Sequence, residues 1–263
     1  MKSLLIIFLL VVSVKAHAKY AGAEVNQIPT ASVFPATNAI LFPSAVSAAG
    51  VNASALGLFG KRTDLQAAYS RGGEEDPQGL FAGTELGSNG FGVGLGYLGQ
   101  KYSSTKNMNN MYGGLGFKLD PLAFGLGVRN MDSVTGSVLD FDFSMMTSER
   151  KGVNFGFVLY NTTHDTRQLD LGLGYAGGRK FNMEVNVLLP PFTNSNSQGY
   201  VFTGAATLYG TDWLAFSGRV SYKTSPADLT YMLGATTWIT DTFNLFLFYT
   251  APRVITGGVT FSF

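Results

Sequence analysis

The stretch FGVGLGYLG, residues Phe91 to Gly99, contains the pattern G-x-G-x-x-G, and the same pattern returns as GLGYAG from Gly172 to Gly177. In dinucleotide-binding folds this pattern leaves a strand and opens a helix, whose N-terminus meets the pyrophosphate. Here apolar residues and glycines alternate, which is the two-residue period of a β-strand. A helix would carry several interior glycines, each costing about 1 kcal/mol relative to alanine. The stretch therefore predicts a strand with one apolar face, and it argues against a nucleotide site.

Composition favours a sheet that faces lipid on one side. Charged residues make up 13% of the chain, whereas a typical soluble domain carries about 25%. Glycine accounts for 33 of 263 residues, well above the usual share of about 7%. The net charge of +1 gives no indication of a nucleic-acid partner. The chain has no cysteine, which excludes disulfides, lipoprotein anchoring and thiol chemistry.

The N-terminus has the features of an export signal. Lys2 supplies a positive charge, residues 4–14 form an apolar run, and Ala16-His17-Ala18 is a small-x-small cleavage site. We expect a signal peptide over residues 1–18 that is cleaved before Lys19. An uncleaved anchor is the alternative, although a membrane-crossing helix needs about 20 apolar residues.

The C-terminus alternates apolar with small or polar residues from Val254 to Phe263. This pattern resembles the final strand of Gram-negative outer-membrane β-barrel proteins, where a terminal aromatic residue after alternating apolar residues is read by the barrel assembly machinery. The resemblance implies an assembly signal at Val259, Phe261 and Phe263, a location in the cell outer membrane, and outer-membrane lipid as a partner. A secreted all-β protein that ends on a core strand is the alternative.

The interior of the chain repeats the segments that such a barrel requires, apolar outward and small or polar inward. From Leu122 to Arg129, Leu, Phe, Leu and Val share one face and Ala, Gly, Gly and Arg the other, and the alternation recurs at 139–144, 153–157, 169–175 and 181–187. Short links at 88–90, 120–121, 148–152, 177–179, 210–212 and 240–242 alternate with longer links at 71–79, 100–110, 130–135, 161–168, 190–198, 223–228 and 251–253. The sequence predicts an all-β fold, a transmembrane antiparallel β-barrel over residues 61–263, with about fourteen strands in a range of twelve to sixteen.

Residues 19–60 form a separate block, because Pro29, Pro35 and Pro43 interrupt the alternation and each proline removes a ladder hydrogen bond. We expect a plug inside the barrel or a periplasmic segment. An extra strand from Asn52 to Gly60 is a further alternative. Inward-phase glycines would leave a recess for such a plug. They are Gly92, Gly94, Gly96, Gly114, Gly116, Gly125, Gly127, Gly156, Gly172 and Gly174.

The strand count, the N-terminal insert and the segment from Asn38 to Ala45 resemble the long-chain fatty acid transporter family of outer-membrane proteins. In that family a small-residue segment with proline precedes the first strand, and an N-terminal hatch fills the lumen. The resemblance implies a plugged barrel that carries hydrophobic compounds.

The sequence contains few residues that could carry out catalysis or bind a metal or cofactor. His164 beside Asp165 lies in a predicted extracellular loop, where a rim hydrolase would place its general base, but a solvated loop histidine is the simpler interpretation. Glu74, Glu75 and Asp76 are interpreted as a solvated loop tip, and no histidine and cysteine cluster provides metal ligands. We therefore expect no enzyme activity, no cofactor and no metal site.

Seven charged residues fall on the inward phase of the predicted strands, where they would line a water-filled path or pair across the lumen. Charge on the outward face near the membrane midplane would cost about 2–4 kcal/mol for Arg or Lys. These residues are Lys118, Arg129, Asp140, Asp142, Asp170, Glu184 and Arg219. The sequence thus favours an outer-membrane pore or transporter for small solutes or hydrophobic compounds. The alternatives are a structural or surface-interaction barrel that transports nothing, and the rim hydrolase.

Overall fold

The computed structural model describes residues 40–43, 45–71, 78–88, 90–103, 106–133, 136–147, 151–162, 167–178, 180–192, 199–225, 227–251 and 254–263. The predicted signal peptide, residues 19–39, the acidic tip at Glu74 to Asp76, and His164 lie outside these residues.

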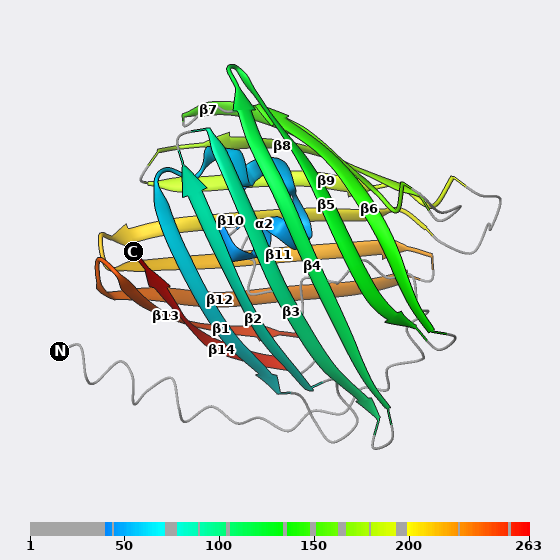
Figure 1. Cartoon of the computed structure of the whole chain (residues 1–263). Helices are drawn as coiled ribbons and strands as arrows, with labels where there is room; N and C mark the ends of the chain where they lie inside the picture. Colours follow the sequence, from blue (N-terminus) through cyan, green and yellow to red (C-terminus); the bar gives the residue numbers. More distant parts are fainter. Residues whose placement is uncertain are drawn as a thin grey trace.

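Fourteen antiparallel strands form one closed barrel, in which each strand pairs with its neighbours in sequence and β1 pairs with β14 (Figure 1). The strands are β1 (Arg62–Arg71), β2 (Gln78–Ser88), β3 (Phe91–Ser103), β4 (Lys106–Leu119), β5 (Leu122–Ser133), β6 (Gly136–Thr147), β7 (Gly152–Tyr160), β8 (Gln168–Ala176), β9 (Phe181–Leu188), β10 (Val201–Thr211), β11 (Leu214–Thr224), β12 (Ala227–Thr240), β13 (Phe243–Thr250) and β14 (Val254–Ser262). The predicted all-β barrel of fourteen strands is confirmed.

Both G-x-G-x-x-G patterns lie in strands, the first in β3 and the second in β8 and the residue that follows it. The alternation read from the sequence is the alternation of burial. In β5, Ala123, Gly125, Gly127 and Arg129 are buried, whereas Leu126 and Val128 are exposed. The same two-residue period is clear in β1, β7 and β10, because successive strand side chains point to opposite faces.

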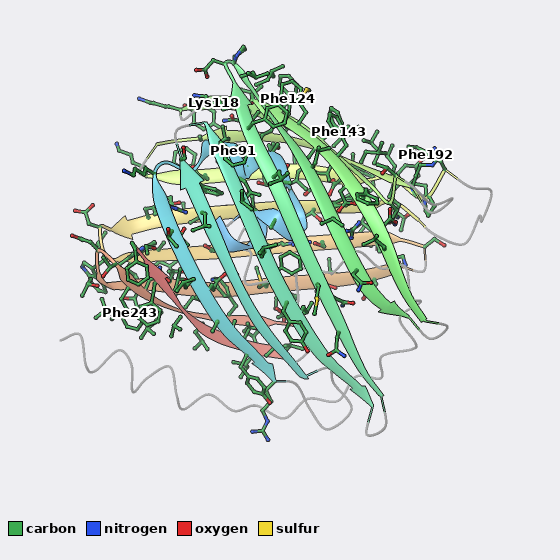
Figure 2. All side chains as sticks on the ribbon, in the orientation of Figure 1. Phe91, Lys118, Phe124, Phe143, Phe192 and Phe243 are labelled. Atoms are coloured by element: carbon green, nitrogen blue, oxygen red, sulfur yellow. The ribbon has the colours of Figure 1, made fainter. Side chains whose placement is uncertain are left out.

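The outer surface of the barrel is apolar and carries aromatic side chains at both ends. At the end with the short turns, Phe117 stacks on Phe124, Tyr175 on Phe181, and Phe243 on Phe261. Figure 2 shows Phe91, Phe124 and Phe243 at this end and Phe192 at the other. Exposed tyrosines gather toward the loop end; they are Tyr69, Tyr200, Tyr222, Tyr231 and Tyr249.

The two aromatic zones enclose a band of exposed aliphatic side chains, among them Leu95, Leu126, Val185 and Leu233. Phe243 and Tyr249 mark the two zones on β13, and their separation corresponds to about 20 Å along a strand. That is close to the roughly 25 Å height of the apolar band on membrane-spanning barrels. An apolar surface of this extent does not occur on soluble monomers, and it fits contact with lipid.

Three of the predicted long links are wrong in length. The predicted loops at 100–110, 130–135 and 223–228 shrink to residues 104–105, 134–135 and 225–226. Backbone pairing between neighbouring strands extends into these polar segments, as Lys101 pairs with Asn107 and Asp132 with Ser137. The strands are therefore longer than their apolar alternation. The apolar alternation ends where the outward face of a strand leaves the lipid. The strand itself can continue beyond that point.

The pairing between β6 and β7 is the shortest ladder in the barrel. Among the described residues it joins only Phe143–Met146 to residues 156–159. Side chains supplement it, since the Thr147 hydroxyl donates to Asn154 Oδ1 at 3.0 Å and accepts from the Phe155 backbone N–H at 3.1 Å. These bonds fasten the seam at its turn end.

Two short helices lie inside the barrel, α2 (Ala45–Val51) and the 3-10 helix η1 (Ala53–Leu58) (Figure 1). We call residues 40–60 the inner segment. The alternative of an extra strand from Asn52 to Gly60 is wrong. Asn52 caps η1 instead, because its Oδ1 accepts from the Ser54 N–H at 3.1 Å, the hydrogen bond that makes asparagine a preferred helix cap. Within the described part of the chain, no helix has the length and apolar character needed to cross a membrane.

Candidate functional site

The inner segment packs directly on glycines of the strands that it faces. A Cβ atom on Gly94 would lie 2.7 Å from the Ala49 Cβ, and one on Gly116 would lie 2.6 Å from the Gly57 N atom. Gly92 and Gly125 meet Leu56 and Ser54 in the same way, whereas a Cβ on Gly114 would lie 3.1 Å from Ala49 and would require only a small shift. Distances below 3.0 Å leave no room for a methyl group, so these glycines are required for the close approach.

A second group of glycines, on β7 and β8, accommodates the start of the inner segment. A Cβ on Gly172 would lie 2.9 Å from the Ile40 side chain, and one on Gly174 would lie 2.9 Å from Leu41. The glycines of the GLGYAG pattern thus make room for Ile40 and Leu41. This agrees with the interpretation of the pattern as part of a strand and not as a phosphate-binding loop.

Two predicted recess glycines have other neighbours. A Cβ on Gly96 would meet the ring of Tyr112 on β4, and one on Gly127 would lie 3.3 Å from the Asp142 Cβ. The expectation that all ten glycines face the block is therefore wrong for Gly96, because the inward Tyr112 ring fills the space first. Gly127 still faces the block, with the Ala49 carbonyl oxygen 3.8 Å from its Cβ position.

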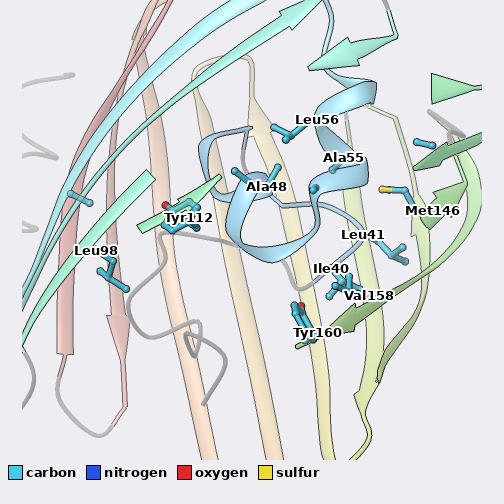
Figure 3. Close-up of a cluster of buried hydrophobic side chains, with 14 of the residues drawn as sticks. Ile40, Leu41, Ala48, Ala55, Leu56, Leu98, Tyr112, Met146, Val158 and Tyr160 are labelled. Atoms are coloured by element: carbon cyan, nitrogen blue, oxygen red, sulfur yellow. The ribbon is translucent and has the colours of Figure 1, made fainter. Parts of the chain in front are cut away.

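Apolar side chains of the inner segment and the barrel form one buried cluster (Figure 3). Leu56 and Ala48 are fully buried, and Ile40 and Leu41 are 2% exposed. They join inward residues of eight strands, which are Ala68, Leu98, Tyr112, Ala123, Met146, Val158, Tyr160, Met232, Phe246 and Phe248 on β1, β3 to β7, β12 and β13. The inner segment is therefore seated by hydrophobic contact as well as by close packing.

Glu184 of β9 binds the start of the inner segment through three consecutive backbone amides. Its Oε1 accepts from the Ile40 N–H at 2.7 Å, and its Oε2 accepts from Leu41 at 3.1 Å and from Phe42 at 3.0 Å. The carboxylate is 3% exposed. Hydrogen bonds to an ionised acceptor are among the strong ones, so Glu184 is a fixed anchor for residues 40–42.

Polar contacts also fasten the helical part. The Asn52 side-chain amide donates to the Ile40 carbonyl at 2.6 Å, and the Ser144 hydroxyl of β6 accepts from the Ser54 N–H at 2.9 Å. The Tyr160 hydroxyl of β7 donates to the Val51 carbonyl at 2.9 Å. The first and third contacts each provide a donor to a backbone carbonyl, and the second gives the Ser54 N–H a barrel acceptor in addition to Asn52 Oδ1.

Arg129 and Asp142 form a buried ion pair beside this contact. Arg129 Nη2 donates to Asp142 Oδ1 at 2.7 Å, and Arg129 Nε lies 2.7 Å from Asp142 Oδ2 as the closest approach of the ion pair. Nη2 also donates to Asn161 Oδ1 at 3.0 Å, and the guanidinium lies 5.1 Å from the Tyr160 ring centroid. The pair thus supports the tyrosine that holds α2.

Asp170 and Arg219 lie on the same inner wall. Asp170 accepts from the Asn186 amide at 2.7 Å. Arg219 Nε donates to the Ser221 hydroxyl at 3.1 Å.

The remaining predicted residues are less central. Lys118 is half-buried near the turn end and lies 2.8 Å from Asp120. Asp140 is 1% exposed and accepts from the Phe141 N–H. Of the seven predicted charges, Arg129 and Asp142 pair with each other, Glu184 binds the inner segment, and Lys118 pairs with Asp120 near the turn end. Whether they line a path for solutes stays a prediction.

Sequence reasoning missed the uncharged residues that hold the inner segment, namely Asn52, Ser144, Tyr160 and Asn161. Ser144 shares the inward phase of Asp140 and Asp142, so its phase was a usable signal. Asn161 has a positive φ of 56°, and no pattern in the sequence indicated its contact with Arg129.

The predicted assembly residues lie at the closing seam. Phe261 stacks on Phe243 with ring centroids 4.9 Å apart, and Val259 pairs with Ala67 of β1. The Phe263 N–H donates to the Thr63 carbonyl at 2.8 Å, and its carbonyl accepts from the Thr63 N–H at 3.0 Å. No group of three or more metal-binding side chains occurs within the ranges that the structure covers.

A closed antiparallel barrel with an apolar outer face, a polar inner wall and an inner segment belongs to the class of porin-like β-barrels. A variant of the Rh. blastica porin with two substitutions is similar to this chain in structure, at 10% identity over 77% of this chain and 99% of the porin, with a TM-score of 0.50. A triple variant of the Rhodopseudomonas blastica porin gives the same identity and coverage and a TM-score of 0.48. No protein-family model and no curated protein sequence matches the chain. At this identity the likeness concerns the fold alone.

Proposed function

We propose that this protein is an outer-membrane pore for small solutes, and that the inner segment restricts passage through it. The observation that carries the proposal is the outer surface, where exposed aliphatic residues lie between two aromatic zones of a closed barrel. Closure matters because lipid offers no hydrogen bonds to an open strand edge.

The inner wall supports a passage for polar solutes. Toward β10–β14, the inward positions include hydroxyl-bearing residues beside apolar ones such as Met232 and Phe248. The Thr207 and Ser217 hydroxyls lie 3.0 Å apart, as do those of Thr203 and Ser221. Within the described residues, the helices α2 and η1 lie against strands β1 to β6, Tyr160 of β7 also reaches α2, and the backbones of both helices stay apart from β10–β14. A path would therefore follow the β10–β14 wall, and the inner segment would set its width.

Conductance of the purified protein in planar bilayers tests the proposal. We expect small unitary steps from the full chain and larger steps from a variant that lacks residues 20–59, because that deletion removes both α2 and η1. Each protein should first show the heat-modifiable gel mobility of a closed barrel. Absence of any steps from correctly folded protein of both kinds would refute the pore.

The same experiment addresses the structural or surface-interaction barrel. That alternative draws on the burial of inward side chains such as Thr203, Thr256 and Asn186, each less than 9% exposed. A fully closed lumen would give no steps even without the inner segment.

Two narrower functions stay predictions. Transport of hydrophobic compounds, as the fatty acid transporter resemblance implies, would use the inward apolar residues Met232, Phe246 and Phe248. A rim hydrolase would depend on His164, which lies outside the described residues, and His164→Ala in an activity screen would test it.

The C-terminal residues are proposed to act as the assembly signal read by the barrel assembly machinery. Because the Phe263 backbone also closes the barrel on Thr63, deletion would confound two effects, and side-chain substitutions separate them. We expect Phe263→Ala to reduce the heat-modifiable fraction in outer membranes several-fold, whereas Phe263→Tyr, which keeps the aromatic ring, should assemble normally. Equal assembly of the two variants would rule out a role for the ring.

A further inference from the structure

Three amide donors at residues 40–42 satisfy the Glu184 carboxylate while the inner segment is seated. If the segment leaves, this nearly buried carboxylate loses those partners, and an uncompensated buried charge is costly. A second partner for Glu184 on the barrel wall would offset this loss and make it easier for the segment to leave.

Arg219 has the position that such a partner requires. Ala205 of β10 pairs with Glu184 of β9 on one side and with Arg219 of β11 on the other. All three lie in one cross-strand row on the inward face, with about 10 Å between the outer two Cα atoms. Alanine presents only a methyl group between the two long side chains, so the guanidinium can cross above it.

Arg219 also has hydrogen-bond donors that are not used in the seated state. The only hydrogen bond that it makes among the described residues uses Nε, which donates to Ser221. The described residues form three ion pairs, and none of them includes Arg219. They are Arg62–Asp64, Lys118–Asp120 and Arg129–Asp142. Its two terminal nitrogens are therefore available, and a guanidinium fork matches a carboxylate in bidentate geometry.

We infer that Arg219 is the second partner of Glu184, so that the Arg219 guanidinium competes with residues 40–42 for the same carboxylate. With the inner segment seated, backbone amides satisfy Glu184; with it displaced, Arg219 does. Both states then satisfy the carboxylate, which makes the inner segment a two-state element. The inference rests on the proposed function, in which the inner segment restricts passage, and it adds that the segment can leave its seat.

Labelling of a single cysteine tests this competition without any solute flux. Because the chain has no cysteine, Val51→Cys in α2 gives one site, and the full chain in lipid vesicles can be labelled with a maleimide. We expect Arg219→Gln to slow labelling by about tenfold, the effect of losing one charge-assisted hydrogen bond in the displaced state. Arg219→Lys, which keeps the charge, should restore much of the rate. Lys118→Gln removes an inward cation that already pairs with Asp120, and it should leave the rate unchanged.

A double-variant cycle shows whether Arg219 acts through Glu184. Glu184→Gln should speed labelling, because an amide has one acceptor oxygen and its NH2 group faces the N–H donors of residues 40–42. In that background Arg219→Gln should have no further effect. Faster or unchanged labelling with Arg219→Gln alone, or an equal effect in both backgrounds, would overturn the inference. If the labelling pattern holds while no variant conducts, the pore is refuted and the inference stands.

Discussion

Replacing Arg129 with methionine should lower the free energy of unfolding by about 3–5 kcal/mol, the cost of removing one partner from a buried ion pair. Arg129 is 2% exposed, and two of its nitrogens lie 2.7 Å from the Asp142 carboxylate oxygens. Without it, the Asp142 carboxylate keeps the Asn161 N–H at 3.1 Å but no cation. Urea unfolding in lipid vesicles, followed by the fluorescence of Trp213 and Trp238, measures the change.

Two further variants locate the source of that loss. Lys118→Met removes an inward cation whose partner Asp120 is 75% exposed, and solvent-screened pairs contribute only about 0–1 kcal/mol. The double variant Arg129→Met with Asp142→Leu leaves no unpaired charge, so it should recover most of the stability. A loss in Arg129→Met no larger than that in Lys118→Met would contradict a stabilising role for the pair.

The barrel could be predicted because its signal is local. The glycine and apolar alternation of β3 and the polar alternation of β6 each fix the outward face of a strand without reference to any distant residue. Turns such as Asp120-Pro121 end strands through their own chemistry. The strand count followed from these two local signals.

The contacts of the inner segment could not be predicted in the same way. Glu184 meets residues about 140 positions away, and no local pattern specifies that three amides will share its carboxylate. The sequence reveals that β3, β4 and β8 present recesses, because glycines recur on one phase. It does not reveal that Tyr112 fills the recess at Gly96, since that depends on the register between β3 and β4.

Gly116→Leu should displace the inner segment from its seat. The new side chain would overlap the Ala53 carbonyl oxygen, the Gly57 nitrogen and the Leu56 Cβ. Gly57 already lies against the barrel wall, since a Cβ on it would lie 2.8 Å from the Phe117 backbone. The inner segment can therefore make room for the leucine only by moving away from the wall. Overpacking of this kind typically costs about 1–3 kcal/mol, which corresponds to roughly 5- to 150-fold in a two-state equilibrium. Maleimide labelling at Val51→Cys should rise by a factor in that range, together with the unitary conductance.

Gly204→Leu is the matched control, because Gly204 lies on the outward phase of β10 and a Cβ there meets nothing within 4 Å. Its leucine would enter lipid, so labelling and conductance should stay at the level of the unsubstituted protein. Faster labelling in both variants would point to general loosening of the barrel. Faster labelling in Gly116→Leu alone, with the heat-modifiable mobility retained, would establish that the glycines of β3 to β5 serve as the seat of the inner segment, because only the inward substitution takes space from it.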